Sequence, residues 1–392
     1  MTDSRSGSSS HLLLLAYYFP PMGMSGVQRV SKFVKYLPDN GWDVTVVTPT
    51  AAGYFAYDAS LLSDVDVPDV QTIRTRSIDP TRFFRPGKVV SLPGEARRRW
   101  ASRLTGLLFV PDNKLGWYPF ARRAAQTAHR LRPFDAVLSS APPYTSHLVA
   151  RAVARRLKRP LVLDFRDDWV GNPRHDYPTA AHRRVHRIME RKAVESSSAC
   201  ITINRVIADS IRNRARSSGE TPRFAVIPQG FDPADFVGPV QVATTSDDRM
   251  RFLYSGVFYD AQTPDPFLRG LRLAIDRRPE LTESLAADFI GLVPSDFEHR
   301  TRALELDRIV RYHGYATHDS AVQWMRRADI LWLTIGRREG SEGISTGKLY
   351  EYVGTRKPIL GLVPEGVARD DIIAYGAGVI ADPESAEDVA SA

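Results

Sequence analysis

Short apolar segments alternate with longer amphipathic segments along most of this chain. Residues 12–19 are apolar throughout, as expected of a strand that is covered on both faces of a sheet. The segment that follows, residues 27–37, carries apolar residues at the i, i+3, i+4 and i+7 positions of a helix. This rhythm is typical of parallel strands joined by crossover helices, so we predict an α/β fold.

The alternation occurs in two series. The first has strands at 12–19, 43–47, 136–140, 161–165, 199–203 and 225–227, with helices at 27–37, 146–157 and 185–195. The second has strands at 251–255, 287–292, 309–313, 330–335, 358–362 and 376–380, with helices at 266–276, 320–327 and 348–353. Residues 228–248 lie between them, are rich in Pro, Gly, Ser and Asp, and show no sustained periodicity. We therefore predict an N-terminal domain of residues 1–238 and a C-terminal domain of residues 239–392.

The loop after the first predicted strand contains small residues. Ser25 and Gly26 precede the first helix, where the backbone can approach a ligand and N–H groups can bind phosphate or sugar hydroxyls. The loop lacks the G-x-G-x-x-G pattern of a dinucleotide-binding fold. The alternative interpretation is a tight turn between strand and helix.

Charged residues gather where the predicted strand 161–165 ends. Asp164, Arg166 and Asp167 lie there, at the sheet edge where ligands of parallel sheets bind. We predict catalytic roles for Arg166 and Asp167; the alternative is an Arg166–carboxylate network that holds the loop. His147 opens the next predicted helix upstream, and a helix N-terminus lowers the pKa of an imidazole and keeps it neutral. His147 is therefore a third catalytic candidate, although a lone histidine is more often structural.

A Gly/Ser/Thr turn opens a helix in the second series. The turn consists of Gly343, Ile344, Ser345 and Thr346. Its N–H groups and the helix dipole favour a diphosphate, and Lys348 adds a positive charge, so Lys348 is both a donor-binding and a catalytic candidate. Glu351 could accept both hydroxyls of a ribose. A surface helix capped by Thr346 is the alternative, but the strand at 358–362 follows at once and buries this helix in the sheet layer.

This segment resembles the nucleotide-sugar motif of retaining GT-B glycosyltransferases of family four, whose second glutamate matches Glu351. Four further stretches are similar to that family, at 17–26, 164–169, 227–232 and 312–315. The resemblance implies a GT-B fold, with two Rossmann-like domains whose parallel sheets face each other across a cleft. It implies an acceptor site in the N-terminal domain and a donor site in the C-terminal domain. The donor site would include Gly256 after the first strand, and Gly314 and Tyr315 in the loop that meets the base.

Three departures from the family pattern are present. The first glutamate of the motif is replaced by Gly343, with Glu342 one residue away, and the loop at 255–262 lacks the usual Arg and Lys. Arg337, Arg338 and Lys348 are candidate substitutes for that charge. The family also ends in a helix that crosses back to the N-terminal domain, and residues 384–392 do not resemble it. We therefore expect a C-terminally shortened chain.

Positive charge is concentrated in one window. Residues 82–132 hold twelve Lys and Arg against two acidic residues, a net charge of +10 in a chain whose total is +8. Within it, Arg97, Arg98 and Arg99 precede Trp100 and further apolar residues at helical spacing, as in a helix that lies on an anionic membrane surface. The alternative is that the apolar residues pack on the sheet while the arginines are solvated. Patterns typical of nucleic-acid binding are absent, so we expect no nucleic-acid partner.

Compartment and cofactors follow from simpler features. Cys200 is the single cysteine, which excludes a disulfide framework and a cysteine-based zinc cluster. No apolar run approaches the length of a membrane span, and no signal-peptide cleavage site follows residues 12–19. The histidines lack metal-ligand spacing. We expect a cytoplasmic protein at the inner face of the membrane, with no protein-bound metal or cofactor, the nucleotide sugar being a substrate.

The leading hypothesis is a retaining glycosyltransferase that moves a sugar from a UDP- or GDP-type donor to a saccharide or lipid-linked acceptor in cell-envelope polysaccharide synthesis. One alternative is a sugar-nucleotide epimerase of similar shape. The other is a non-catalytic nucleotide-sugar-binding subunit, which Gly343 and the missing phosphate-binding Arg and Lys favour.

Overall fold

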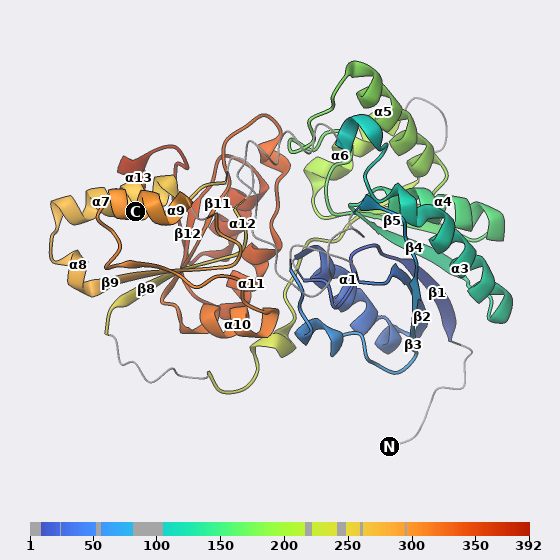
Figure 1. Cartoon of the computed structure of the whole chain (residues 1–392), viewed down its shortest axis with the longest axis horizontal. Coiled ribbons are helices and arrows are strands. Elements are labelled where there is room, and N and C mark those ends of the chain that lie inside the picture. Colours follow the sequence, from blue (N-terminus) through green and yellow to red (C-terminus); the bar gives the residue numbers. More distant parts are fainter. Residues whose placement is uncertain are drawn as a thin grey trace. The chain divides into compact units, whose positions relative to one another are not determined.

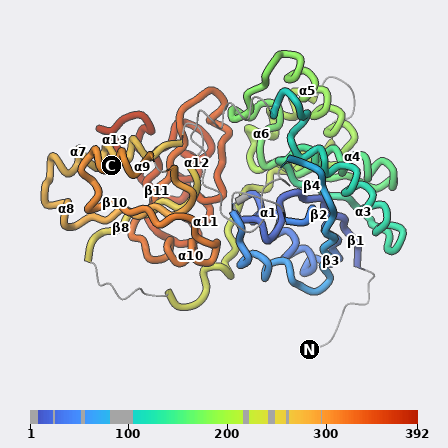
Figure 2. Tube along the Cα trace, viewed as in Figure 1, coloured from blue at the N-terminus to red at the C-terminus, as the bar shows by residue number. Residues whose placement is uncertain are grey.

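The computed structural model describes residues 9–23, 25–51, 56–80, 105–215, 222–240, 248–258, 262–294 and 296–392. They form two compact units, each built on a parallel sheet covered by helices (Figures 1 and 2). The first unit runs to Pro228 and the second continues from Gln229. Among the described residues, no helix is both long enough and apolar enough to cross a membrane.

The N-terminal unit has a seven-stranded sheet within the described residues, in the order β3-β2-β1-β4-β5-β6-β7. The strands are β1 (Ser10–Leu15), β2 (Trp42–Pro49), β3 (Val70–Thr75), β4 (Ala136–Ala141), β5 (Leu161–Phe165), β6 (Ala199–Thr202) and β7 (Arg223–Val226). The helices are α1 (Ser25–Tyr36), α3 (Tyr118–Leu131), α4 (Thr145–Leu157), α5 (Ala180–Glu195) and α6 (Arg205–Ala215), with short 3₁₀ turns η1 (Pro38–Asn40), η2 (Ser60–Leu62) and η4 (Leu115–Trp117).

The leucines of β1 show why this strand is central. Leu13 and Leu15 point into the core cluster that α3 and α4 cover, whereas Leu12 and Leu14 join the cluster beneath α1. Neighbouring side chains of a strand point to opposite faces, so a continuous apolar run is buried on both. Each buried leucine contributes about 1.5–3 kcal/mol relative to an exposed one.

The first strand is shorter than predicted. Pairing ends at Leu15, so residues 16–19 form a buried loop instead of the end of a strand. Tyr17 explains the burial, because its ring packs edge-on against Trp117 and its hydroxyl donates to Asp79 at 2.8 Å. Neither β3 nor α3 was among the predicted elements; β3 is a half-exposed edge strand with few apolar residues.

The C-terminal unit has a six-stranded sheet within the described residues, in the order β10-β9-β8-β11-β12-β13. The strands are β8 (Met250–Ser255), β9 (Leu285–Ile290), β10 (Val310–Tyr312), β11 (Ile330–Thr334), β12 (Ile359–Leu362) and β13 (Gly378–Ala381). The helices are α7 (Asp265–Arg277), α8 (Leu281–Ser284), α9 (Asp296–Ala303), α10 (His318–Arg327), α11 (Gly347–Thr355), α12 (Val367–Tyr375) and α13 (Ala386–Ser391), with 3₁₀ turns η5 (Pro233–Phe236) and η6 (Ser341–Gly343). The prediction of two parallel α/β sheets in tandem is confirmed.

The boundary between the units lies earlier in the chain than the expected position near residue 238. Phe231 and Phe236 account for this, because both rings pack against the backbone of α11 at Gly354. The two rings also contact each other edge-on, with centroids 5.7 Å apart. The segment after Pro228 therefore belongs to the C-terminal core.

Candidate functional site

Three glycine turns lie at the carboxyl ends of β8, β9 and β10 in the C-terminal unit. Gly256, Gly291 and Gly314 all have positive φ angles, of 142°, 122° and 73°. A methyl group on Gly291 would collide with the carbonyl oxygen of Gly256, so the two backbones are in direct contact. The amide of Gly291 also donates to the carbonyl of Gly314 at 2.7 Å. The three loops are thus linked, and bare backbone lines this edge of the sheet.

Lys348 lies beside the first of these turns. Its ammonium donates to the hydroxyl of Tyr254 at 2.7 Å and sits 4.2 Å from the centroid of that ring. A methyl group on Gly256 would lie only 2.8 Å from Lys348 Nζ. The structure therefore brings two predicted donor-binding residues, Gly256 and Lys348, together at the carboxyl end of β8. Both lie where ligands of open parallel sheets bind.

The predicted turn before α11 is present. Thr346 occupies the N-cap position with extended backbone, but its side chain makes no capping hydrogen bond within the described structure. Thr346 is thus the N-cap residue by position, and the helix buries Leu349 and Tyr352 on one side. The Leu349 amide donates to the Thr346 carbonyl at 3.1 Å, and the start of the helix favours an anion through its dipole. Gly343 closes η6, Ile344 follows it, and Ser345 Oγ lies 3.3 Å from the Tyr350 hydroxyl.

Glu351 lies one turn further along α11 and has a partner that sequence reasoning missed. His318 Nε2 is 2.8 Å from Glu351 Oε1, and the His318 side chain is 7% exposed. Asp235 Oδ2 is 3.9 Å from the same imidazole nitrogen. His318 begins α10, directly after the loop that holds Gly314 and Tyr315. His318 therefore orients the Glu351 carboxylate, and side chains of η5, α10 and α11 meet at its imidazole although no local sequence pattern connects them.

The candidate substitutes for the missing phosphate-binding charge differ in position. Arg337 donates to Asp382 at 2.8 Å and approaches Glu384 at 3.7 Å. Lys348 lies at Gly256, as described above. The Glu342 side chain is exposed, and its backbone packs closely against Gly366. Lys348 is therefore the substitute that the structure places at the glycine turns.

Arg166 holds together the predicted site of the N-terminal unit. Its guanidinium donates to the carbonyls of Gly26 and Pro142, and to that of Ala141 at 3.3 Å, with 6% of the residue exposed. It thus ties the first loop to the end of β4. These three partners are backbone carbonyls, so the guanidinium holds the loop as the structural alternative proposed. Asp167 beside it is partly exposed and makes no hydrogen bond or ion pair with the residues that the structure describes.

The neighbouring carboxylates are structural. Asp164 is buried and accepts from Arg29, at 2.9 Å, and from Ser140, at 2.7 Å. The same Arg29 guanidinium donates to the carbonyls of Ile227 and Pro228 at 3.0 and 2.8 Å. This buried pair anchors the end of the unit to α1. Sequence reasoning did not identify Arg29, because its partner lies far away along the chain.

His147 is fully buried in the first turn of α4. Ser139 Oγ lies 2.8 Å from Nδ1, while Nε2 has no hydrogen-bond partner in the described structure. The pKa of His147 is lowered to about 3, mainly by burial and secondly by the positive charge of Arg166. The imidazole is therefore neutral, as predicted, but the cause is burial and not the helix N-terminus. The ring of Phe165 packs against it at 4.5 Å.

Other predicted residues lie outside the described part of the chain. Arg97, Arg98, Arg99 and Trp100 fall within residues 81–104, so the membrane-surface prediction stays a prediction. Ser25 begins α1, but its side chain is also outside the description.

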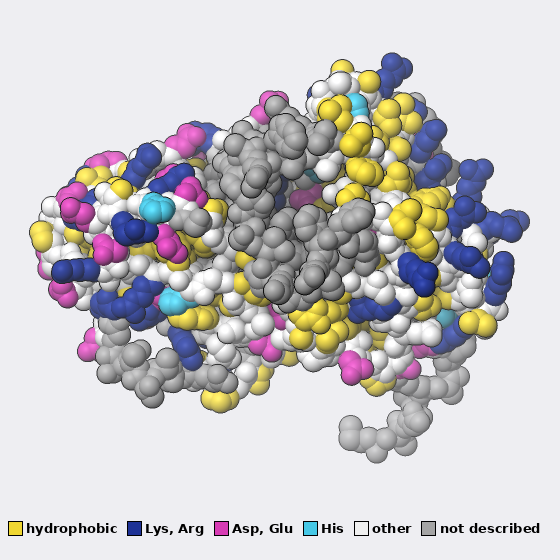
Figure 3. All heavy atoms as spheres, viewed as in Figure 1, with side chains coloured by type: hydrophobic (Ala, Val, Ile, Leu, Met, Phe, Trp, Pro, Cys, Tyr) yellow, Lys and Arg dark blue, Asp and Glu magenta, His cyan; other side chains and the backbone are white. Residues whose placement is uncertain are grey.

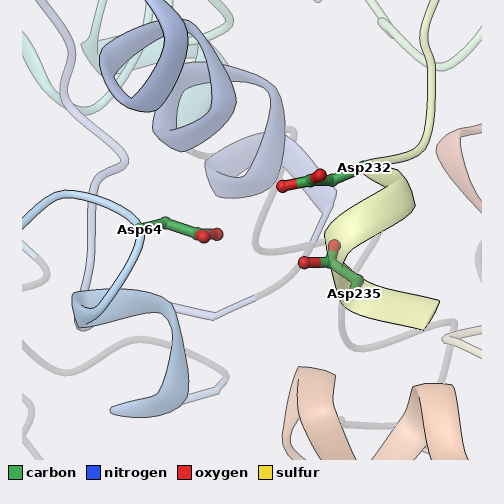
Figure 4. A group of neighbouring side chains, drawn as sticks. All are labelled: Asp64, Asp232 and Asp235. Atoms are coloured by element: carbon green, nitrogen blue, oxygen red, sulfur yellow. The ribbon is translucent and has the colours of Figure 1, made fainter. Parts of the chain in front are cut away.

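Three aspartates in Figure 4 have local roles. In the N-terminal unit, Asp64 accepts from Lys32 at 2.7 Å and Lys35 at 3.1 Å, which neutralises its charge. In the C-terminal unit, Asp232 and Asp235 belong to the segment of η5 (Figure 4). Asp232 caps η5 by accepting from the Ala234 amide at 2.9 Å, and Asp235 Oδ2 lies 3.9 Å from His318 Nε2. The expectation of no bound metal stays a prediction.

Comparison with known proteins gives a consistent result. Residues 26–230, more than half of the chain, match the family model described as "Glycosyl transferase 4-like domain". No curated protein sequence matches the chain.

Solved structures resemble the whole chain. Sucrose-phosphate synthase from Thermosynechococcus elongatus is 14% identical, with a TM-score of 0.67, over 98% of this chain and 88% of that one. Anabaena HepE in complex with UDP is 16% identical, with a TM-score of 0.61, over 97% and 88%. WaaG, a glycosyltransferase involved in lipopolysaccharide biosynthesis, is 15% identical, with a TM-score of 0.59, over 97% and 88%. The predicted GT-B class, with two Rossmann-like domains, is confirmed.

Proposed function

Because the chain belongs to the glycosyl transferase 4-like family, we propose that it is a retaining glycosyltransferase with a UDP- or GDP-type nucleotide sugar as donor. The acceptor is a saccharide or a lipid-linked saccharide. The observation that carries the proposal is the placement of Lys348, Gly256 and the start of α11 at one edge of the C-terminal sheet. Such an edge offers a positive charge and the N-terminal end of a helix to a diphosphate.

The diphosphate, ribose and base of the donor bind in that order along this edge of the sheet. The diphosphate lies against Gly256, Lys348 and the first amides of α11. One turn along the helix, Glu351 accepts the ribose hydroxyls, and His318 holds its carboxylate in place at 2.8 Å. The base then reaches the loop of Gly314 and Tyr315, which leads directly to His318.

Catalysis rests on stabilising the leaving diphosphate and on positioning the acceptor. Lys348 and the α11 amides carry the first task, because negative charge grows on the diphosphate as the bond to the sugar breaks. Asp167 is proposed for the acceptor side, since its carboxylate is partly exposed and is not engaged by any described residue. Arg166 and buried His147 act by positioning, through the loop and strand ends that they hold.

The biological setting is a separate part of the proposal. The likeness to WaaG and the basic segment 82–132 support action on cell-envelope polysaccharide at the inner face of the membrane. Cosedimentation with anionic and neutral vesicles tests this attachment. Salt-sensitive binding to anionic vesicles that is lost when Arg97, Arg98 and Arg99 are changed to Glu is the expected result. Equal binding to both vesicle types refutes it.

A panel of UDP- and GDP-sugars tests the function as a whole. Each is incubated with the full chain, with and without saccharide acceptors, while nucleotide release and thermal stabilisation are recorded. We expect stabilisation by one donor class together with release of its nucleoside diphosphate. Stabilisation without release indicates a non-catalytic binding subunit, which the Gly343 departure favours. A change of configuration at one carbon of the sugar, without release of nucleoside diphosphate, indicates an epimerase.

A further inference from the structure

A hollow of about 510 Å³ lies on the N-terminal unit between α5 and α6. Five arginines line it: Arg183, Arg184, Arg187 and Arg191 from α5, and Arg214 from α6. Figure 3 shows Lys and Arg side chains projecting from the surface that α5 forms with its neighbouring helices. The proposed donor residues belong to the other unit, and none of the residues proposed for the acceptor side lines this hollow, so an inference here goes beyond the proposed function.

The positive charge of the hollow is only partly neutralised. Arg214 donates to Glu190 at 2.7 Å and also binds Asp168, so carboxylates compensate its charge. Arg183, Arg184 and Arg187 are exposed and make no hydrogen bond or ion pair with the residues that the structure describes. These three guanidinium groups therefore present uncompensated charge to a ligand.

Arg191 adds an unsatisfied donor. Its Nε is buried without a hydrogen-bond partner among the described residues. Arg191 Nε forms an ion pair with the Glu195 carboxylate at 3.6 Å, which is too long for a hydrogen bond. The charge of Arg191 is therefore partly compensated, while its Nε–H still lacks an acceptor at hydrogen-bonding distance. An anion seated in the hollow supplies such an acceptor.

The spacing of the arginines matters as well. Arg183, Arg187 and Arg191 follow one another at i, i+4 and i+8, so they line one helical face over about 12 Å. Like charges four residues apart destabilise a helix, and an anion between them removes the repulsion. Ile188 lies on the same face, lines the hollow and is 37% exposed, so it offers an apolar contact within the ring of charge.

We propose that this hollow binds a phosphate group, carried either by a lipid headgroup or by a free phosphorylated solute. Guanidinium groups bind phosphate oxygens through paired N–H donors, and arginine is the preferred residue for that geometry. The volume of the hollow lies in the range of small-molecule sites. The apolar contact of Ile188 suits the carbon-bearing part of either ligand.

The test compares the full chain with two double variants. Arg183→Ala with Arg187→Ala removes two charges from the hollow. Arg155→Ala with Arg156→Ala removes two exposed charges from α4 and serves as the matched control. Alanine is the most favourable residue in a helix, so both variants should fold, and their thermal midpoints verify it. One arm titrates sodium pyrophosphate by calorimetry; the other sediments the proteins with phosphatidylcholine vesicles, with and without phosphatidylglycerol.

The α5 variant should bind at least one probe at least tenfold more weakly than the α4 control, because one charged hydrogen bond lost to phosphate lowers affinity by about tenfold and the variant removes two arginines. If the α5 variant loses binding only to phosphatidylglycerol vesicles, the ligand is a lipid headgroup. If it loses pyrophosphate binding, the ligand is a free phosphorylated solute. Pyrophosphate bound elsewhere contributes equally to all three proteins and cancels. Equal binding by the two variants to both probes, or no binding by the unchanged protein, overturns the proposal.

Discussion

Replacing Lys348 by alanine should reduce sugar transfer by about 30- to 1,000-fold while leaving the fold intact. A ligand that approaches the Gly256 backbone comes within about 4 Å of Lys348 Nζ, where two opposite unit charges interact by about 4 kcal/mol at the effective dielectric of a protein surface. The side chain is only partly buried, so solvent screening reduces this to about 2–4 kcal/mol of transition-state stabilisation. The lost contact with the Tyr254 ring contributes only about 1 kcal/mol to stability.

The assay measures release of nucleoside diphosphate under single-turnover conditions with the donor that the panel identifies. Lys357→Ala is the matched control, because it removes the same charge just beyond the other end of α11. That control should retain normal turnover. If Lys348→Ala keeps near wild-type turnover, or if both variants lose activity equally, then Lys348 does not stabilise the leaving group. The donor site then does not lie at the Gly256 turn.

Three further predictions concern other parts of the two units. Glu351→Gln keeps the shape but removes the charge, so calorimetry should show nucleotide affinity weakened by about 1–2 kcal/mol with an unchanged thermal midpoint; unchanged affinity with lost stability makes the residue structural. Gly291→Ala should cost about 2 kcal/mol or more in denaturant unfolding, because its methyl group meets Gly256 and its φ is 122°, whereas Gly376→Ala, with φ 77° and open space, should cost less. Burial lowers the pKa of His147 to about 3, so between pH 6.5 and 3 the unfolded chain binds a proton that the native chain does not. Stability should therefore fall with decreasing pH by up to about 1.4 kcal/mol per unit in that window, and His147→Gln should flatten the slope in urea unfolding measured at pH 7 and pH 4.5; an unchanged slope refutes this.

Much of the fold was predictable because local periodicity carries the information. The helix predicted at 266–276 is observed as α7, Asp265–Arg277, and the strand at 358–362 as β12, Ile359–Leu362. The predicted end of the first strand was wrong, because residues there are buried without pairing as part of a strand. Residues 16–19 are apolar because Tyr17 packs against Trp117 while Ala16 and Phe19 pack in the cluster beneath α1, not because they extend β1.

The candidate site was predictable to a lesser degree. Lys348 and Gly256 were both named from the sequence, but their proximity depends on α11 meeting the end of β8, which only the assembled sheet brings about. The role of Arg166 changed for the same reason. It donates to the carbonyls of Gly26, Ala141 and Pro142. Because every residue has a backbone carbonyl, the residue types in a sequence do not show which carbonyls accept such hydrogen bonds.

Residue order alone predicted two parallel α/β units, a Gly/Ser/Thr turn before α11, and a basic segment in the N-terminal half. Each of these depends on neighbours within one element or one loop, whose spacing is visible in the sequence. Tertiary structure decided which distant groups meet, as when His318 binds Glu351 and Arg29 binds Asp164. It also decided that His147 is buried, because exposure depends on the packing of whole elements and not on the chemistry of one side chain.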